Sequence, residues 1–129
     1  MKTSIGFIGG GRITKIFLQG FKNDDIRFES VKVFEPNSET LEKLTNVFPQ
    51  IEKAETVAAA ASQQIVFLAV HPPVMTETLQ NVKEAVSKST VVVSLAPKIT
   101  LEKMAANLPT KNLARMIPNA TSIINEGFN

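Results

Sequence analysis

The sequence lacks cysteine altogether and has a single histidine, His71. The absence of cysteine excludes a disulfide framework, a thiolate metal site and a thiol nucleophile. With only one histidine, a zinc site and a Ser-His-Asp triad are both poor interpretations. We therefore expect no bound metal, and we expect a reducing, cytoplasmic setting.

The sequence also lacks a large excess of one charge and any long apolar segment. The chain has 14 basic and 12 acidic residues, which leaves a net charge of +2, and the basic residues form no cluster. We therefore expect neither nucleic acid nor a membrane surface as a partner. The longest apolar run, residues 65–70, is too short to span a bilayer, and the first residues lack the apolar core of a signal peptide. The 129 residues are 43% hydrophobic, which is enough for one globular domain with a buried core.

The chain alternates short apolar runs with longer segments whose apolar residues recur at helical spacing. Ile13, Phe17 and Phe21, for example, mark one stripe of an amphipathic helix. This alternation predicts βαβ units with right-handed crossovers. The expected architecture is a Rossmann-type α/β fold, with a doubly wound, mainly parallel sheet, helices on both faces and the strand order 3-2-1-4-5-6. We expect six strands, near residues 4–8, 31–34, 51–54, 65–70, 90–94 and 113–117, and five helices that include residues 13–21, 41–48, 56–61, 75–86 and 101–108.

Apolar residues also follow the last expected strand, where no further element remains to cover them. These residues are Ile123, Ile124 and Phe128. An exposed apolar tail is typical of a surface that meets a partner. We therefore expect a second domain or subunit to follow Asn129.

Three consecutive glycines, residues 9–11, connect the first expected strand to the first expected helix. Gly9 would permit the tight turn, and Gly11 would let the backbone approach a pyrophosphate because it has no side chain. The N-terminus of the following helix offers unpaired N–H groups and a positive dipole end to the anion. In this position the motif predicts a dinucleotide site rather than a merely flexible turn. One departure is Thr14, which stands at the third motif position in place of glycine or alanine and could hold helix and strand apart.

Glu35 ends the second expected strand, roughly 20 residues after the third motif position, where the dinucleotide fingerprint places an acid. A carboxylate there accepts hydrogen bonds from the adenosine ribose hydroxyls and repels a ribose 2′-phosphate. The cofactor is therefore expected to be NAD or NADP, with NAD slightly favoured. The alternative interpretation is that Glu35 only opens a solvated turn.

Two further segments come at the carboxyl ends of strands, where ligands of doubly wound sheets bind. His71 and Pro72 follow the fourth expected strand, and residues 94–96 follow the fifth. His71 could lie near a nicotinamide, but catalysis by it is the weaker interpretation. Arg12 could reach a phosphate or only be solvated, and Arg115 has no assigned role. The residues show no acid–base pair, so the catalytic residues are unknown.

Four blocks of the sequence resemble the N-terminal half of the pyrroline-5-carboxylate reductase family. They are residues 6–11 (GFIGGG), 67–72 (FLAVHP), 92–96 (VVSLA) with Thr100 and Leu101, and 115–119 (RMIPN) with Glu126 and Gly127. The resemblance runs over nearly the whole chain and covers about half of a family member. It implies that residues 1–129 form the dinucleotide-binding domain. It also implies that the family's C-terminal helical domain, which dimerises and completes the substrate site, is missing here.

The resemblance also implies a set of site residues. Asn119 corresponds to an asparagine on the substrate side, near the family's domain junction. The departures are Thr14, His71 in place of a lysine, Ala120-Thr121 in place of Thr-Pro, and acids at 35 and 39, in a loop that usually suits a 2′-phosphate. The implied cofactor contacts are Ile8, Gly9, Gly10, Gly11, Arg12, Ile13, Glu35, Asn37, Ser38, Ala69, Val70, His71, Pro72, Ser94, Leu95 and Ala96.

The activity implied by the resemblance is hydride transfer from a nicotinamide to the C=N carbon of a small cyclic imine, in proline biosynthesis. The family forms homo-oligomers through its second domain, so the present chain alone should bind cofactor and turn over poorly. Two alternatives stay open. One is another oxidoreductase of the superfamily, such as one related to the coenzyme F420-dependent NADP oxidoreductases. The other is a non-catalytic NAD(H)-binding module.

Overall fold

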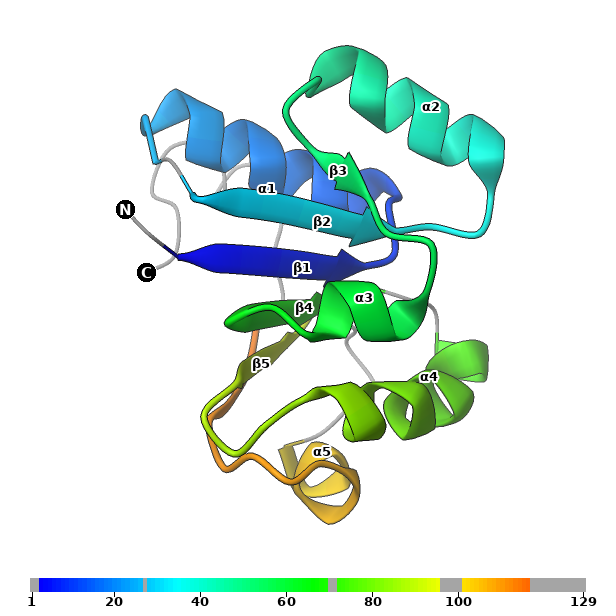
Figure 1. Ribbon diagram of the computed structural model, residues 1–129, viewed down its shortest axis with the longest axis vertical. Helices are drawn as coiled ribbons and strands as arrows, with labels where there is room; N and C mark the ends of the chain where they lie inside the picture. Colours follow the sequence, from blue (N-terminus) through cyan, green and yellow to red (C-terminus); the bar gives the residue numbers. More distant parts are fainter. Residues whose placement is uncertain (1–2, 27, 70–71, 96–100, 117–129) are drawn as a thin grey trace.

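The computed structural model describes residues 3–26, 28–69, 72–95 and 101–116, with the backbone alone for residues 72–76. Within these ranges six strands alternate with five helices, as the sequence predicts (Figure 1). In chain order they are β1 (Ser4–Ile8), α1 (Arg12–Asn23), β2 (Ser30–Phe34), α2 (Ser38–Val47), β3 (Glu52–Lys53), α3 (Val57–Ala61), β4 (Ile65–Leu68), α4 (Pro72–Ala85), β5 (Val91–Ser94), α5 (Leu101–Asn107) and β6 (Leu113–Arg115).

The strands form one parallel sheet in the order β3-β2-β1-β4-β5-β6, which confirms the predicted order. The chain builds outward from β1 to β3 and then crosses to the other side of β1, so the strand order reverses between β1 and β4. The carboxyl ends of β1, β2, β4 and β5 lie side by side in the sheet. Ile8 pairs with both Phe34 and Leu68, and Leu68 pairs with Ser94. The segments after these strands therefore leave one edge of the sheet at its switch point, where doubly wound folds bind ligands.

Each face of the sheet has its own buried core. On one face, α1 and α2 cover a cluster rich in phenylalanine, in which the Phe7 and Phe67 rings stack with centroids 4.8 Å apart. Phe17 of α1 packs against the same ring at 5.6 Å. This contact fixes α1, and with it the glycine loop, on the sheet.

On the other face, α3, α4 and α5 cover a cluster of aliphatic residues and alanines. Here α3 lies close to β1. A Cβ built on Gly6 would lie 1.9 Å from the carbonyl oxygen of Ala60. Glycine is therefore required at this position by the close approach of helix and strand.

Some element bounds differ from those expected. β3 is a two-residue strand, and β4 and β6 end at Leu68 and Arg115. Helix α4 begins at Pro72 rather than near Met75. Proline suits the first turn of a helix, because the N–H groups there have no partner within the helix and the missing N–H of proline costs no hydrogen bond. Proline does not, however, contribute to the apolar periodicity by which a helix is recognised in the sequence. For that reason the periodicity located the body of α4 and missed its start. The apolar residues 123, 124 and 128 lie outside the described residues.

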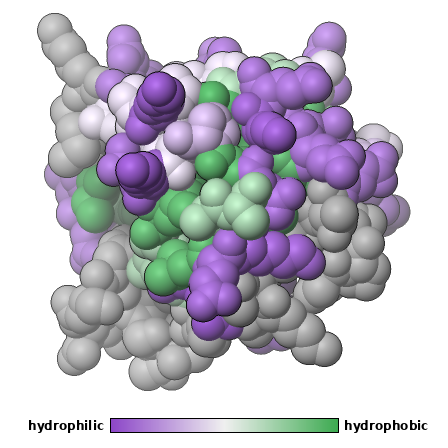
Figure 2. All heavy atoms as spheres, turned by 90° about the horizontal axis from the view of Figure 1, so that it is seen from below, coloured by the Kyte–Doolittle hydropathy of each residue, from purple (hydrophilic) through white to green (hydrophobic). Residues whose placement is uncertain are grey.

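Figure 2 shows apolar residues gathered near the centre of the face seen from below, the end of the molecule at which α5 lies. Leu101 of α5 is 47% exposed, an unusual exposure for a large apolar side chain among the described residues. Among the described residues, no helix combines the length and the apolar character that crossing a bilayer requires.

Candidate functional site

The glycine loop forms a tight turn directly after β1. Gly9 has a φ of +110°, a conformation that favours glycine, which confirms that this residue makes the turn. The N–H of Gly9 donates to the carbonyl of Phe34 at 2.8 Å, so the loop begins as a continuation of the β1–β2 pairing. The loop is thereby fixed at the carboxyl edge of the sheet.

Helix α1 starts immediately after this turn, with Gly11 as its N-cap and without a side chain that caps its N–H groups. The first N–H groups of a helix have no partner within the helix, and they carry the positive end of its dipole. A Cβ built on Gly11 would meet nothing within 4 Å, so the space above the loop is open. The arrangement is chemically suited to an anion such as a pyrophosphate.

Thr14, the departure at the third motif position, fits between helix and strand. It is fully buried, and its hydroxyl donates to the carbonyl oxygen of Gly9 at 2.6 Å. Helix α1 packs on the sheet through Phe17 all the same. The expectation that Thr14 could hold the two apart is therefore wrong, because the hydroxyl finds a partner in the loop itself.

Glu35 lies half-buried just beyond β2 and contacts two backbone segments. Its Oε1 accepts a hydrogen bond from the N–H of Gly10 at 2.9 Å, and its Oε2 accepts one from the N–H of Asn37 at 2.9 Å. The side chain of Asn37 caps α2 by accepting from the N–H of Thr40 at 3.0 Å. The carboxylate thus ties the glycine loop to the start of α2, so Glu35 does more than open a solvated turn.

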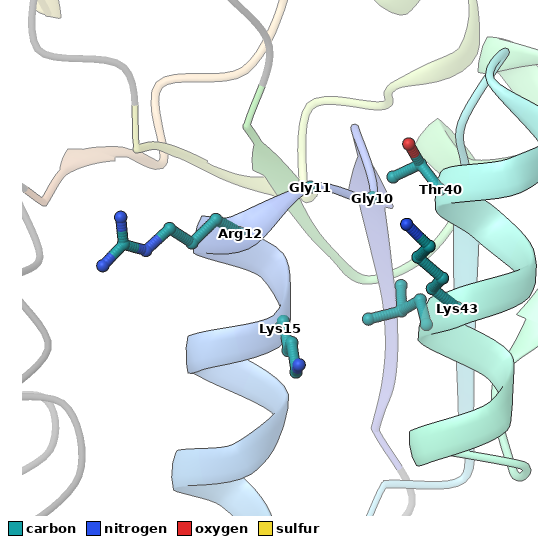
Figure 3. A pocket seen from close by; sticks show the side chains of 7 residues that line it. Gly10, Gly11, Arg12, Lys15, Thr40 and Lys43 are labelled. Atoms are coloured by element: carbon teal, nitrogen blue, oxygen red, sulfur yellow. The ribbon is translucent and has the colours of Figure 1, made fainter.

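A pocket of about 180 Å³ lies between the start of α1 and α2 (Figure 3). Three of the residues that line it are basic and none is acidic. Thr40 and Lys43 extend from α2 toward the glycine loop, whereas Arg12 extends away from α2. The complete lining is Gly10, Gly11, Arg12, Lys15, Thr40, Lys43 and Leu44. Sequence reasoning missed Lys15, Thr40 and Lys43, because these side chains belong to helices whose relative placement the sequence pattern does not give.

The other expected contacts divide into three groups. Ala69 and Ser94 lie at the carboxyl edge, and the side chains of Ile8 and Leu95 point into the cores, so only their backbone is available at the edge. Ile13 is half-buried against the phenylalanine-rich core, and Ser38 is exposed at the start of α2. Four expected contacts lie outside the described residues, namely Val70, His71, Ala96 and Asn119. Of Pro72, only the backbone is described.

The titratable groups of the described residues give no evidence of a metal site. No group of three or more histidine, cysteine, aspartate or glutamate side chains that could hold a metal ion is found in the part of the chain that the structure describes. Among the described residues, the carboxylate of Glu35 contacts the glycine loop, and the cations Arg12, Lys15 and Lys43 line the adjoining pocket, with Lys43 paired to Glu39. The three cations can bind an anionic ligand, whereas the carboxylate of Glu35 holds the glycine loop.

Comparison with protein families gives one match that covers most of the chain. A family model described as NADP oxidoreductase, coenzyme F420-dependent, matches residues 4–98. The matched range starts at β1 and includes the glycine loop, Glu35 and the pocket between α1 and α2.

Similar proteins include pyrroline-5-carboxylate reductases. The enzyme of Escherichia coli (strain K12) is 30% identical over 132 residues, covering 99% of this chain and 48% of that protein. Pyrroline-5-carboxylate reductase 3 of Xenopus laevis is 30% identical over 125 residues, covering 95% of this chain and 45% of that protein. The structure of a pyrroline-5-carboxylate reductase from Coxiella burnetii aligns with a TM-score of 0.82 at 20% identity, over 100% of this chain and 52% of that chain. The chain thus spans about half the length of the curated relatives it matches.

Proposed function

Because the chain belongs to the family described as NADP oxidoreductase, coenzyme F420-dependent, we propose that it is the cofactor-binding domain of an NAD(P)-dependent oxidoreductase. The observation that carries this proposal is the glycine loop. The loop turns at Gly9 with φ +110°, lies at the switch point of the sheet and opens onto the uncapped N-terminus of α1. Such a loop binds the pyrophosphate of a dinucleotide through backbone N–H groups.

The dinucleotide would lie across the carboxyl edge of the sheet. Its pyrophosphate would contact the glycine loop, its adenosine end would lie near residues 35–38, and its nicotinamide end would lie near Ala69 and Ser94. Residues 70–72, Ala96 and, on the substrate side, Asn119 complete this proposed site. The support for this placement is the register, which brings Ile8, Phe34, Leu68 and Ser94 to one level.

Calorimetric titration of the chain with NADH and with NADPH tests the proposal. Binding of either dinucleotide is expected, and Gly11→Val should weaken it by tenfold or more, because the added side chain would fill the space above the loop. Lys22→Ala, at an exposed residue on the last turn of α1, is the control and should leave the affinity unchanged. If neither dinucleotide binds to the folded chain, the proposal is wrong.

The reaction we propose is hydride transfer from the nicotinamide to the C=N carbon of a small cyclic imine, as in the pyrroline-5-carboxylate reductases. It is supported by 30% identity to the Escherichia coli enzyme across nearly the whole chain. The nicotinamide supplies the hydride when bound, and the residues of this chain orient it and exclude water. The cytoplasmic setting expected from the cysteine-free composition belongs to this proposal.

A second domain belongs to the proposal because the chain spans only about half of its relatives. We propose that residues 1–129 are one dinucleotide-binding domain and that a helical domain supplies the substrate contacts and the homo-oligomer interface. The exposed side chain of Leu101 on α5 supports a partner surface at that end of the molecule. A protein extended by that domain should reduce pyrroline-5-carboxylate, and failure to do so would contradict the imine reductase assignment.

The family description favours a second candidate, an oxidoreductase that transfers hydride between NADP and coenzyme F420. Assays of the two-domain protein with pyrroline-5-carboxylate and with reduced coenzyme F420 separate the candidates. Tight binding of a dinucleotide without turnover in either assay would favour a non-catalytic NAD(H)-binding module. Glu35 favours NAD over NADP in the sequence argument, and the parallel titrations with NADH and NADPH test that preference.

A further inference from the structure

Gly10, the middle residue of the glycine loop, is constrained in a different way from Gly9. The φ angle of Gly9 lies in the left-handed region and that of Gly10 does not, so the backbone conformation does not require glycine at residue 10. The requirement comes from a neighbouring side chain. A Cβ built on Gly10 would lie 3.0 Å from the Cβ of Glu35, 3.3 Å from its Cγ and 3.3 Å from Cγ1 of Val33. Glycine at residue 10 therefore lets the side chain of Glu35 lie directly against the loop.

From this position the carboxylate of Glu35 forms hydrogen bonds with two backbone segments. Its Oε1 accepts from the N–H of Gly10 at 2.9 Å, and its Oε2 accepts from the N–H of Asn37 at 2.9 Å. Asn37 in turn caps α2 by accepting from the N–H of Thr40. A continuous series of hydrogen bonds thus runs from the glycine loop, through one carboxylate, to the first turn of α2.

Glu35 carries a negative charge beside a loop that is proposed to bind an anion. Charge repulsion alone would make Glu35 weaken the binding of a pyrophosphate there. Its two charge-assisted hydrogen bonds act in the opposite direction, because they fix Gly10 and thereby the N–H groups that follow it at the start of α1. The two effects have opposite signs, so a single substitution can separate them.

We propose that Glu35 is a positioning residue for the pyrophosphate of the dinucleotide, and that glycine is needed at residue 10 to admit its side chain. The inference rests on the proposed function and deepens it. Glu35 acts through the backbone of the loop, and this role requires no contact with the adenosine ribose. It therefore applies to NADH and NADPH equally.

Inorganic pyrophosphate is the probe that tests this role, because it can contact the loop and has no ribose. Its binding is followed by the NMR shifts of the Gly11 and Arg12 amides, and NADH binding is followed by calorimetry. Glu35→Gln keeps one acceptor oxygen and presents an NH₂ group in place of the other, so one of the two bonds is lost. Although a negative charge is removed, this variant should bind pyrophosphate and NADH about tenfold more weakly.

Glu42→Gln is the matched control for the change of charge. Glu42 is an exposed acid on α2, and the substitution removes the same charge without altering the contact between Glu35 and the loop. Both affinities should be unchanged in this variant. In Glu35→Gln, the amide of Gly10 should exchange hydrogen faster while that of Phe7, in the buried strand β1, is unchanged. That difference would show a local effect on the loop rather than a general loss of stability.

Gly10→Ala tests the fit between the two residues. The added Cβ must displace the side chain of Glu35, so pyrophosphate affinity should fall about as far as in Glu35→Gln. In the double variant the two losses should not add, because both substitutions disrupt the same contact. Losses that add would show that residues 10 and 35 affect the ligand independently, which would overturn the inference.

The outcomes separate this inference from the proposed function. If Glu35→Gln weakens NADH binding but not pyrophosphate binding, Glu35 acts on the ribose, and the inference is overturned while the cofactor domain stands. If the variant binds pyrophosphate more tightly, charge repulsion dominates and the inference is again overturned. If the unaltered chain binds neither NADH nor NADPH, the proposed function is wrong and the inference falls with it.

Discussion

The two faces of the sheet are packed in different ways. The face under α1 and α2 buries phenylalanines, with Phe7, Phe17 and Phe67 in mutual contact. The face under α3 and α4 buries alanine and branched aliphatic residues, and Gly6 admits α3 to close range. The phenylalanine-rich face carries the glycine loop and the basic pocket, so the large rings support the helices on which ligand binding depends.

The largest effect is expected from removing a ring on the phenylalanine-rich face. Phe67→Ala should lower the free energy of unfolding by about 3–5 kcal/mol, because this buried ring contacts the rings of Phe7, Phe17 and Phe21. Urea denaturation measures the loss. Val66→Ala, the adjacent buried residue on the opposite face, is the comparison and should cost less. Equal losses would show that the two faces do not differ in this way.

The face of the sheet that α3 covers should be destabilised by one added side-chain carbon. Gly6→Ala should destabilise the protein by about 3 kcal/mol, because the new Cβ meets the backbone carbonyl of Ala60, which a side-chain rotation cannot relieve. Gly11→Ala is the matched control, since its Cβ would meet nothing within 4 Å. It should cost less than about 1 kcal/mol, measured by thermal unfolding. If Gly6→Ala left the stability unchanged, the close approach of α3 to β1 would be contradicted.

The loop can be loosened without changing its shape. Thr14→Val should cost about 2 kcal/mol, since the carbonyl of Gly9 loses the hydroxyl that donates to it at 2.6 Å. Dinucleotide affinity should fall as well, because the loop would be less firmly held. Thr14→Ser keeps the hydroxyl, and affinity measured by calorimetry should recover. Unchanged affinity in Thr14→Val would mean that the bond has no part in shaping the site.

The smallest effects compare two helix caps. Asn37 caps α2 and Thr56 caps α3, each by accepting one backbone hydrogen bond. Replacing either with alanine should cost about 1 kcal/mol of stability. Only Asn37→Ala should also weaken dinucleotide binding, because Glu35 ties the start of α2 to the glycine loop. If Thr56→Ala weakened binding equally, the assignment of the two faces to binding and support would be wrong.

The strand order and the position of the glycine turn were predictable from sequence because both depend on local signals. Alternating periodicity gives the order of elements, and three glycines after a strand mark the turn. The close approach at Gly6 was not predictable, since it depends on how α3 crosses β1. For the same reason the pocket residues Lys15 and Lys43 were missed, because their meeting depends on the angle between two helices.

Glu35 illustrates a different limit. Its position after β2 was predicted, and its placement beside the glycine loop agrees with the fingerprint. Its hydrogen-bond partners, the N–H groups of Gly10 and Asn37, could not be predicted, because a sequence pattern does not show which of several nearby donors a carboxylate will choose. The preference for NAD that the sequence argument takes from this residue stays a prediction, which the parallel titrations with NADH and NADPH test.

Hydrogen bonds to the Phe34 carbonyl, the Thr14 hydroxyl and the Glu35 carboxylate hold Gly9 and Gly10 of the glycine loop. All three are made by the protein with itself, so a ligand meets a loop that has already lost its conformational freedom. Little ordering entropy is then spent at the moment of association, which favours fast capture and an affinity set by the contacts themselves. The turn is thus a preorganised binding site, and differences in affinity between ligands depend on the side chains that surround it.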